Sequence, residues 1–147
     1  MKSSRMSQIP LRVRFLGSGD NFGSGGRFQA CILVEAADAH FLLDCGASSL
    51  IAMRRYGIST EQVDAILISH LHGDHFGGIP FFLLDAQLIS RRTKPLIIAG
   101  PPGLTERTRT LMEAMYPGMA SVTRNFPVHY VEMEEEQPVR VGNLTVT

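Results

Sequence analysis

The sequence has little of what would tie a protein to a membrane, to an anionic polymer or to an oxidising compartment. Its 147 residues include two cysteines, Cys31 and Cys45, which are too few for a disulfide scaffold and which we expect to be buried free thiols in a reducing compartment. The 14 basic and 14 acidic side chains balance, so a protein that coats nucleic acid or an anionic membrane is not indicated. No apolar leader follows the first residues, and the apolar run at 79–84 is too short to cross a bilayer. We therefore expect a cytoplasmic protein without a membrane partner.

Basic residues are densest at Arg91, Arg92 and Lys94, where we expect a solvated face at the end of a helix. The remaining composition, with 44% hydrophobic and 19% charged residues, is typical of a globular chain that can form a core. Internal repeats and low-complexity segments are absent from the sequence, so a single domain is expected.

Hydrophobic periodicity predicts a β-meander followed by alternating strands and helices, which is typical of a layered α/β fold. We expect strands at 11–16, 30–35, 40–44, 63–69, 96–99, 126–133 and 139–147, and helices at 48–56, 79–91 and 105–116. Gly142 and Asn143 are expected to form a hairpin turn. The last alternation stops within a strand pattern, so we expect residues 1–147 to be one truncated domain.

The glycine-rich segment 17–26 could be mistaken for a phosphate-binding loop. Such loops lead into a helix, whose N-terminus holds the phosphate, whereas a strand is expected after this one. We therefore do not assign it that function, although a minor role in substrate binding stays open.

Three of the five histidines lie within six residues, in the motif His70-Leu71-His72-Gly73-Asp74-His75. His70 and His72 follow a buried strand and are two residues apart, so on an extended backbone they would reach the same metal ion. Gly73 is expected to permit a turn that a side chain would obstruct, from which Asp74 and His75 project toward a second metal. Imidazole and carboxylate ligands suit zinc and would also serve manganese or iron. His40 and His129 are expected to be structural.

These residues resemble the metallo-β-lactamase superfamily. Residues 41–46, Phe-Leu-Leu-Asp-Cys-Gly, look like the strand that ends in an aspartate in that superfamily. Residues 15–19, 76–80 and 96–103 are more specifically similar to the ribonuclease Z and arylsulfatase-like branch.

The resemblance implies a four-layer αβ/βα sandwich, of which this chain supplies the N-terminal half. It implies a site with two metal ions, for which His70, His72, Asp74 and His75 are ligands. Asp74 would also be catalytic, and Asp44 would support the ligands by hydrogen bonding. The second half of the family fold supplies further ligands that cannot be found here, so we expect the isolated chain to be weakly active or inactive.

The leading functional hypothesis is dinuclear zinc-dependent hydrolysis of a phosphodiester, as in ribonuclease Z-like enzymes, with RNA as one candidate substrate. Small-molecule hydrolysis by the same fold, on cyclic nucleotides, sulfate esters or lactones, is the first alternative. The second is an inactive metal-binding or interaction fragment. An apolar sheet face left open by a half-sandwich would favour association, so a homo-oligomer is expected.

Overall fold

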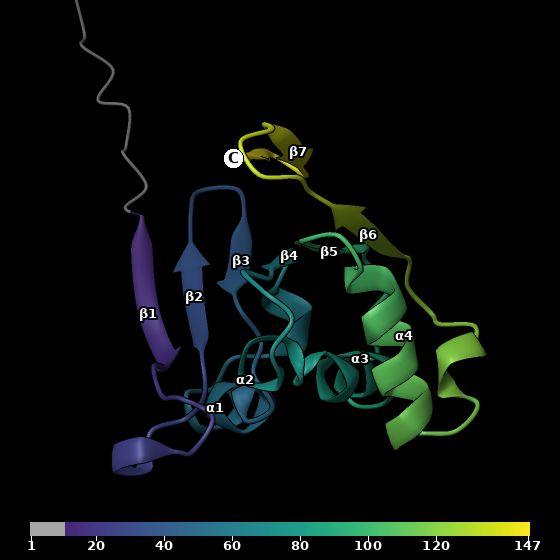
Figure 1. Ribbon diagram of the computed structural model, residues 1–147, viewed down its shortest axis with the longest axis horizontal. Coiled ribbons are helices and arrows are strands. Elements are labelled where there is room, and N and C mark those ends of the chain that lie inside the picture. The colour runs from purple at the N-terminus through teal and green to yellow at the C-terminus, as the bar shows by residue number, and fades with distance from the viewer. Residues whose placement is uncertain (1–10) are drawn as a thin grey trace, which may run out of the picture.

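The computed structural model describes residues 11–147 and contains a six-stranded sheet in the order β1-β2-β3-β4-β5-β6 (Figure 1). Its strands are β1 (Arg12–Gly17), β2 (Cys31–Glu35), β3 (His40–Leu43), β4 (Ala65–Leu67), β5 (Leu96–Gly100) and β6 (Val128–Glu132). The first two pairings are antiparallel and the next three are parallel. A separate hairpin contains β7 (Val139–Val141) and β8 (Leu144–Val146). The expected meander, the alternation after it and the hairpin turn are confirmed.

Four α-helices accompany the sheet: α1 (Ser49–Arg55), α2 (Gly73–Phe76), α3 (Ile79–Leu88) and α4 (Leu104–Met115). Short 3-10 turns lie at η1 (Ser24–Gly26), η2 (Thr60–Gln62) and η3 (Met119–Ser121). The main core is formed where the helices pack on one face of the sheet. Its largest fully buried hydrophobic side chains are Leu42, Met53, Ile66, Ile79, Phe82, Leu83, Leu96, Ile98, Leu104 and Met112.

The opposite face of the sheet is also apolar but is only partly covered. The β7–β8 hairpin covers its middle, where Val141 packs with Ala65 and Ala99. Toward β1 the cover ends, and alternate side chains such as Val13 and Phe15 are exposed. The expectation of an exposed apolar sheet face is therefore confirmed for this edge. In the part of the chain described, no helix has the length and apolar character needed to cross a membrane.

Helix α3 ends three residues earlier than the expected boundary at 91. Arg91 adopts a left-handed backbone with φ 51°, and the N–H of Arg92 returns to the carbonyl of Ala86 at 2.8 Å. A left-handed residue with such a backward hydrogen bond is a common way for a helix to stop.

The solvated basic face expected at this helix end is wrong for Arg92. Its side chain is fully buried, and its guanidinium donates to the carbonyls of Thr60, Lys94 and Pro95. A buried arginine needs such acceptors, and Thr60 is too far away in the sequence for a local charge pattern to reveal it. Lys94 is paired with Asp64 at 2.9 Å, so of the three only Arg91 is both exposed and outside any ion pair among the described residues.

Both cysteines are free and buried, as expected. Burial raises the pKa of Cys31 to about 11 and that of Cys45 well above its ordinary value. Since the thiolate is the reactive form, we expect the native protein to react with a disulfide reagent at pH 8 roughly a hundredfold more slowly than a free thiol. Stopped-flow absorbance measures the rate, and the unfolded chain in guanidinium is the control. Fast labelling of the folded protein would contradict the burial of both thiols.

Candidate metal centre

The histidine motif and Asp44 meet at one edge of the sheet. Strands β3 and β4 are parallel, so their carboxyl ends lie side by side, and Asp44 follows the first while the motif follows the second. The N–H of Asp44 continues the pairing by donating to the carbonyl of Leu67 at 2.8 Å. This topology brings together residues that are about thirty positions apart, as the separation of Asp44 and His75 shows.

Asp44 is held in a left-handed conformation, with φ 61°. Aspartate tolerates this region better than most residues, yet it still indicates a strained, over-determined position. The side chain accepts three hydrogen bonds: from the Ser69 N–H at 2.8 Å, the Ser69 hydroxyl at 2.9 Å and His75 Nδ1 at 2.7 Å. Asp44 therefore fixes the orientation of one histidine of the motif and of the residue that precedes the motif.

The same hydrogen bonds indicate which ring nitrogens of His70 and His75 remain available to bind a metal ion. A carboxylate only accepts, so His75 Nδ1 carries the proton that it shares with Asp44. Ser69 has one hydroxyl proton, which it donates to Asp44, so its oxygen accepts from His70 Nδ1 at 3.0 Å. In the neutral form of each ring, Nε2 is then the nitrogen without a proton, and it is the atom that could bind a metal.

Asp74 is buried beside His75, whose Nε2 lies 3.3 Å from Asp74 Oδ2. Among the described residues, Asp74 Oδ1 is one of the few buried side-chain oxygens without a hydrogen-bond partner. Leaving a buried carboxylate oxygen unpaired is unfavourable unless it has a function such as binding a cation. This orphaned oxygen is the observation that makes the set of donors fit a metal ion.

The ring of His70 lies next to the rings of both other motif histidines. The ring centroids of His70 and His75 are 4.0 Å apart, and those of His70 and His72 are 4.7 Å apart in an edge-to-face arrangement. Within residues 11–147, no set of three or more histidine, cysteine, aspartate or glutamate side chains converges on one point as metal ligands would. The structure thus brings the four predicted ligands together, while their role as ligands stays a prediction.

Glycines pack the motif against its neighbours, but not at the position expected. A Cβ on Gly73 would meet nothing within 4 Å, so the expectation that Gly73 avoids an obstruction is wrong. The motif turns by forming the single-turn helix α2, which most residues could adopt there. The close packing lies instead at Gly78, where a Cβ would lie 2.2 Å from the carbonyl oxygen of Gly46.

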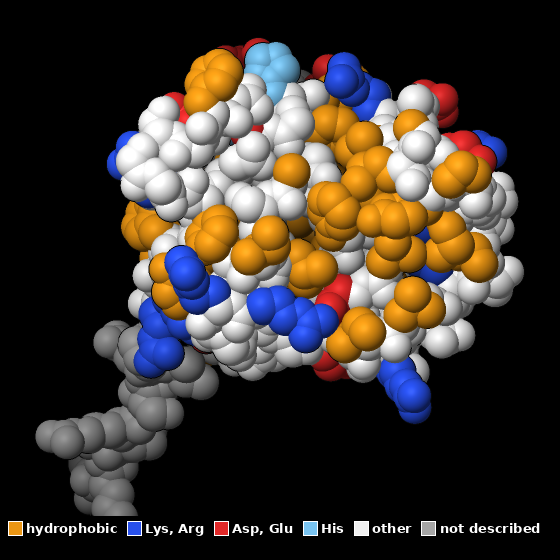
Figure 2. All heavy atoms as spheres, turned by 90° about the horizontal axis from the view of Figure 1, so that it is seen from below, with side chains coloured by type: hydrophobic (Ala, Val, Ile, Leu, Met, Phe, Trp, Pro, Cys, Tyr) orange, Lys and Arg blue, Asp and Glu red, His pale blue; other side chains and the backbone are white. Residues whose placement is uncertain are grey.

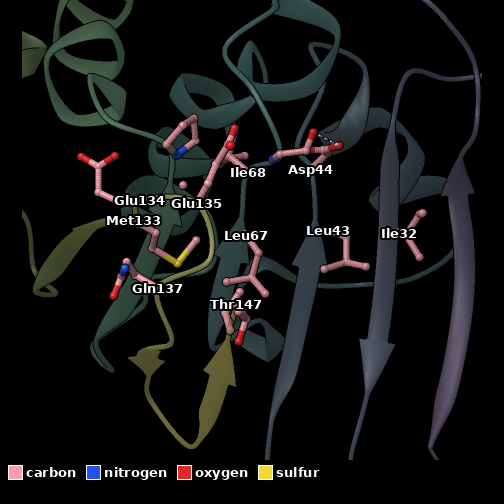
Figure 3. A pocket seen from close by; sticks show the side chains of 14 residues that line it. Ile32, Leu43, Asp44, Leu67, Ile68, Met133, Glu134, Glu135, Gln137 and Thr147 are labelled. Carbon is pink, nitrogen blue, oxygen red and sulfur yellow. Dashed lines mark hydrogen bonds between the residues drawn. The ribbon is translucent and has the colours of Figure 1, made fainter.

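A hollow of about 550 Å³ opens next to Asp44 and Ser69 (Figure 3). Ile32, Leu43 and Leu67 form its apolar floor across β2, β3 and β4, and Glu134 and Glu135 stand at its rim. It lies on the sheet face that the hairpin only partly covers.

Ser69 is the residue of this centre that sequence reasoning missed. Its function depends on the left-handed backbone of Asp44, which places the carboxylate over the Ser69 N–H. The only signal in the sequence was its position directly before His70.

The fold is that of the metallo-β-lactamase superfamily, in its ribonuclease Z branch, as the resemblance had implied. The chain belongs to the family described as Anti-Pycsar protein Apyc1, whose model matches residues 11–147.

Relatives agree with this placement. Ribonuclease Z from Borrelia garinii subsp. bavariensis is 30% identical over 124 residues, which cover 84% of this chain and 37% of that protein. The crystal structure of human tRNase Z, short form, is 28% identical with a TM-score of 0.65, covering 86% of this chain and 48% of the other. The metallo-β-lactamase fold protein YhfI from Bacillus subtilis is 21% identical with a TM-score of 0.67, and the match covers 92% of this chain and 50% of the other. At this identity the likeness supports the fold alone. The chain thus spans about two fifths to one half of the length of these proteins.

Proposed function

We propose that the chain carries the first part of a phosphodiesterase site, ribonuclease Z-like, in which His70, His72, Asp74 and His75 bind metal. The observation that carries the proposal is the position of His75 between two carboxylates. Asp44 holds the proton on Nδ1, and Asp74 lies beside the free Nε2 with one buried oxygen unpartnered. Families with this fold generally use zinc, so zinc is the proposed metal, two ions are the proposed number, and manganese and iron are the alternatives.

The chain's own residues have separable roles in this proposal. A bound metal ion supplies water that ionises near neutral pH. Asp44 and Ser69 orient His70 and His75 and keep their tautomers fixed. Asp74 Oδ1 either binds a metal or accepts the proton of the attacking water, since nothing else among the described residues engages that oxygen. His72, the N-cap residue of α2, is exposed, so a metal ion can reach its ring from solvent.

Metal content per chain tests the proposal first. Purified protein is dialysed against zinc, manganese or iron and analysed by elemental mass spectrometry, with and without prior chelation. We expect zinc to be retained and removed by the chelator. Hydrolysis of bis-p-nitrophenyl phosphate is followed in parallel, and we expect weak turnover, or none, from the 147-residue chain. A chain that retains no metal from any of the three solutions contradicts the proposal.

Exchanging Asp44 for asparagine tests the support of the ligands. The amide can still accept from the Ser69 N–H, but its NH₂ group then faces His75 Nδ1 and favours the wrong tautomer. We expect zinc affinity to fall about 10- to 100-fold, the range for residues that orient metal ligands. Competition with a fluorescent zinc chelator gives the affinity. The control is Asp64→Asn, which should leave the zinc affinity unchanged, because Asp64 precedes β4 and accepts from the N–H of His40 at the opposite end of the strands from the motif. Equal affinity in the wild type and in Asp44→Asn would contradict the orienting role.

The proposed substrate is a phosphodiester, with RNA as the macromolecular candidate and a small ester as the alternative.

A homo-oligomer is proposed on the exposed apolar edge around Val13 and Phe15. Sedimentation velocity tests it: we expect Phe15→Lys to shift the chain toward monomer, and a monomeric wild type would contradict it.

A further inference from the structure

The glycine-rich loop between β1 and β2 presents an aromatic side chain with unusual exposure. Phe22 is 91% exposed, the highest value among the large hydrophobic residues described. A single exposed apolar residue needs no explanation when it lies on a flexible segment, but this loop is tightly organised. The Asp20 carboxylate accepts from the N–H groups of Phe22 and Ser24 and from the Ser24 hydroxyl at 2.7 Å.

The base of the loop is equally constrained. The Gly19 N–H donates to the Phe28 carbonyl at 2.7 Å, and a Cβ on Gly17 would overlap the Gln29 carbonyl oxygen at 1.9 Å. The hydrogen bonds from Ser24 lower the pKa of Asp20, so the carboxylate that organises the loop stays charged. The backbone at Phe22 is thus held in place before any partner arrives, which reduces the backbone entropy that binding would lose.

A hollow of about 390 Å³ lies beside Phe22, lined by Arg27, Phe28 and Gln29 from the loop and by Ser48 and Ile51 from the start of α1. A second, of about 190 Å³, shares Arg27 and Phe28 and adds Arg55, which stacks on the Phe28 ring at 5.3 Å from its centroid. Among residues 11–147 neither Arg27 nor Arg55 forms an ion pair with a carboxylate. The carboxylate nearest to Arg27 in the sequence is that of Asp20, and it already accepts hydrogen bonds from Phe22 and Ser24 of the loop. Figure 2, which views the molecule from below, shows hydrophobic side chains and arginine or lysine side chains interspersed on the surface at this end.

The two hollows, which share Arg27 and Phe28, form a groove that lies next to the histidine motif. The Gln29 N–H donates to the Ser48 hydroxyl at 2.8 Å, and the Gly46 N–H donates to the Ala30 carbonyl at 3.0 Å. Gln29 and Asp74 lie against the same face of Gly46, because a Cβ there would lie 2.7 Å from Gln29 Cβ and 2.2 Å from the Asp74 carbonyl oxygen. The lining of the groove therefore adjoins the backbone of one proposed metal ligand. Figure 1 shows the same arrangement, with η1, α1 and α2 at one end of the sheet.

We propose that this groove binds one nucleotide, whose base stacks on Phe22 and whose phosphate is held by Arg27. The choice of ligand rests on the proposed phosphodiesterase function. An exposed aromatic ring on a constrained loop, beside an arginine outside any ion pair among the described residues, is a combination that binds single-stranded nucleotides without reading their sequence. The contact comes from side chains, in agreement with the expectation that the glycines themselves do not form a phosphate loop, since β2 and not a helix follows.

Fluorescence anisotropy with a labelled oligouridylate of about ten nucleotides tests the inference. The measurement is made in EDTA, so that neither metal nor hydrolysis contributes. We expect Phe22→Ala to weaken binding about tenfold, Phe22→Trp to retain it, and Arg27→Gln to lower the salt dependence by about one phosphate contact. The matched controls are Leu88→Ala and Arg109→Gln, which replace exposed residues on α3 and α4 and should bind as the wild type does.

Competition with uridine monophosphate identifies the source of the nucleotide. Equal competition by the mononucleotide supports a free nucleotide, and competition only by the oligomer supports an RNA strand. Wild-type chain that binds neither probe, or Phe22→Ala that binds as the wild type does, overturns the inference. Circular dichroism confirms folding of each variant, which the exposure of Phe22 favours. Loss of metal retention with intact Phe22-dependent binding would overturn the proposed function alone. Retention of metal without Phe22-dependent binding would overturn this inference alone.

Discussion

His72→Ala is expected to weaken zinc binding by more than a hundredfold, and to abolish whatever diester turnover the chain shows. His72 is exposed at the start of α2 and makes no side-chain hydrogen bond among the described residues, so its removal should cost little stability. Its ring stands edge-to-face against that of His70, with the ring centroids 4.7 Å apart. Losing a direct ligand should exceed the 10- to 100-fold effect of losing an orienting partner.

The matched control is His129→Ala, because His129 is also an exposed histidine but lies on β6, away from the motif. Zinc titration in the presence of a competing chelator, with thermal unfolding of the zinc-free proteins, separates ligand loss from misfolding. The zinc-free His72→Ala and wild-type chains should unfold at the same temperature. Undiminished zinc affinity in His72→Ala would remove this residue from the proposed site, and a parallel loss in His129→Ala would show that binding is nonspecific.

Where elements could be predicted from the sequence, local periodicity was sufficient. The continuous apolar runs at 63–69 and 96–99 contain β4 and β5, because strands buried on both faces have no polar side to display. The hairpin follows from Gly142, which has φ 59° at the turn. The clustering of the motif with Asp44 was implied by the resemblance, and parallel pairing of β3 and β4 produces it.

What could not be predicted depends on partners distant in the sequence. Arg92 is buried because the Thr60 carbonyl accepts from it, and Ser69 orients His70 because Asp44 bends into a left-handed conformation. The single-turn helix α2 is too short for a periodic signal, and it is fixed by the Cys45 N–H, which donates to the His75 carbonyl at 2.6 Å. Local patterns describe which face is apolar, whereas these contacts exist only once the sheet edge has formed.

Gly46→Ala is expected to destabilise the chain by about 3 kcal/mol or more, at the upper end of the range for overpacked positions. A Cβ on Gly46 would lie 2.2 Å from the Asp74 carbonyl oxygen, 2.9 Å from its carbonyl carbon and 2.7 Å from Gln29 Cβ. Two of these atoms belong to the backbone and cannot move as the end of a flexible side chain can. Relief therefore requires a shift of the segment that carries Asp74, so the variant should also bind zinc more weakly than its stability alone would predict.

Gly73→Ala is the control, because it lies within the motif itself yet a Cβ there would meet nothing within 4 Å. Helix α2 begins at this residue, and alanine is a better helix former than glycine, so Gly73→Ala should be as stable as the wild type or slightly more stable. Thermal unfolding of the zinc-free chains makes the comparison, and about 3 kcal/mol corresponds to a midpoint lowered by roughly 6–12 °C. If Gly46→Ala unfolds with the wild type, the close packing of residues 45–46 against the motif is wrong. If instead Gly73→Ala is the unstable variant, the motif turns in the way that its sequence suggested, and the single-turn helix is not its native form.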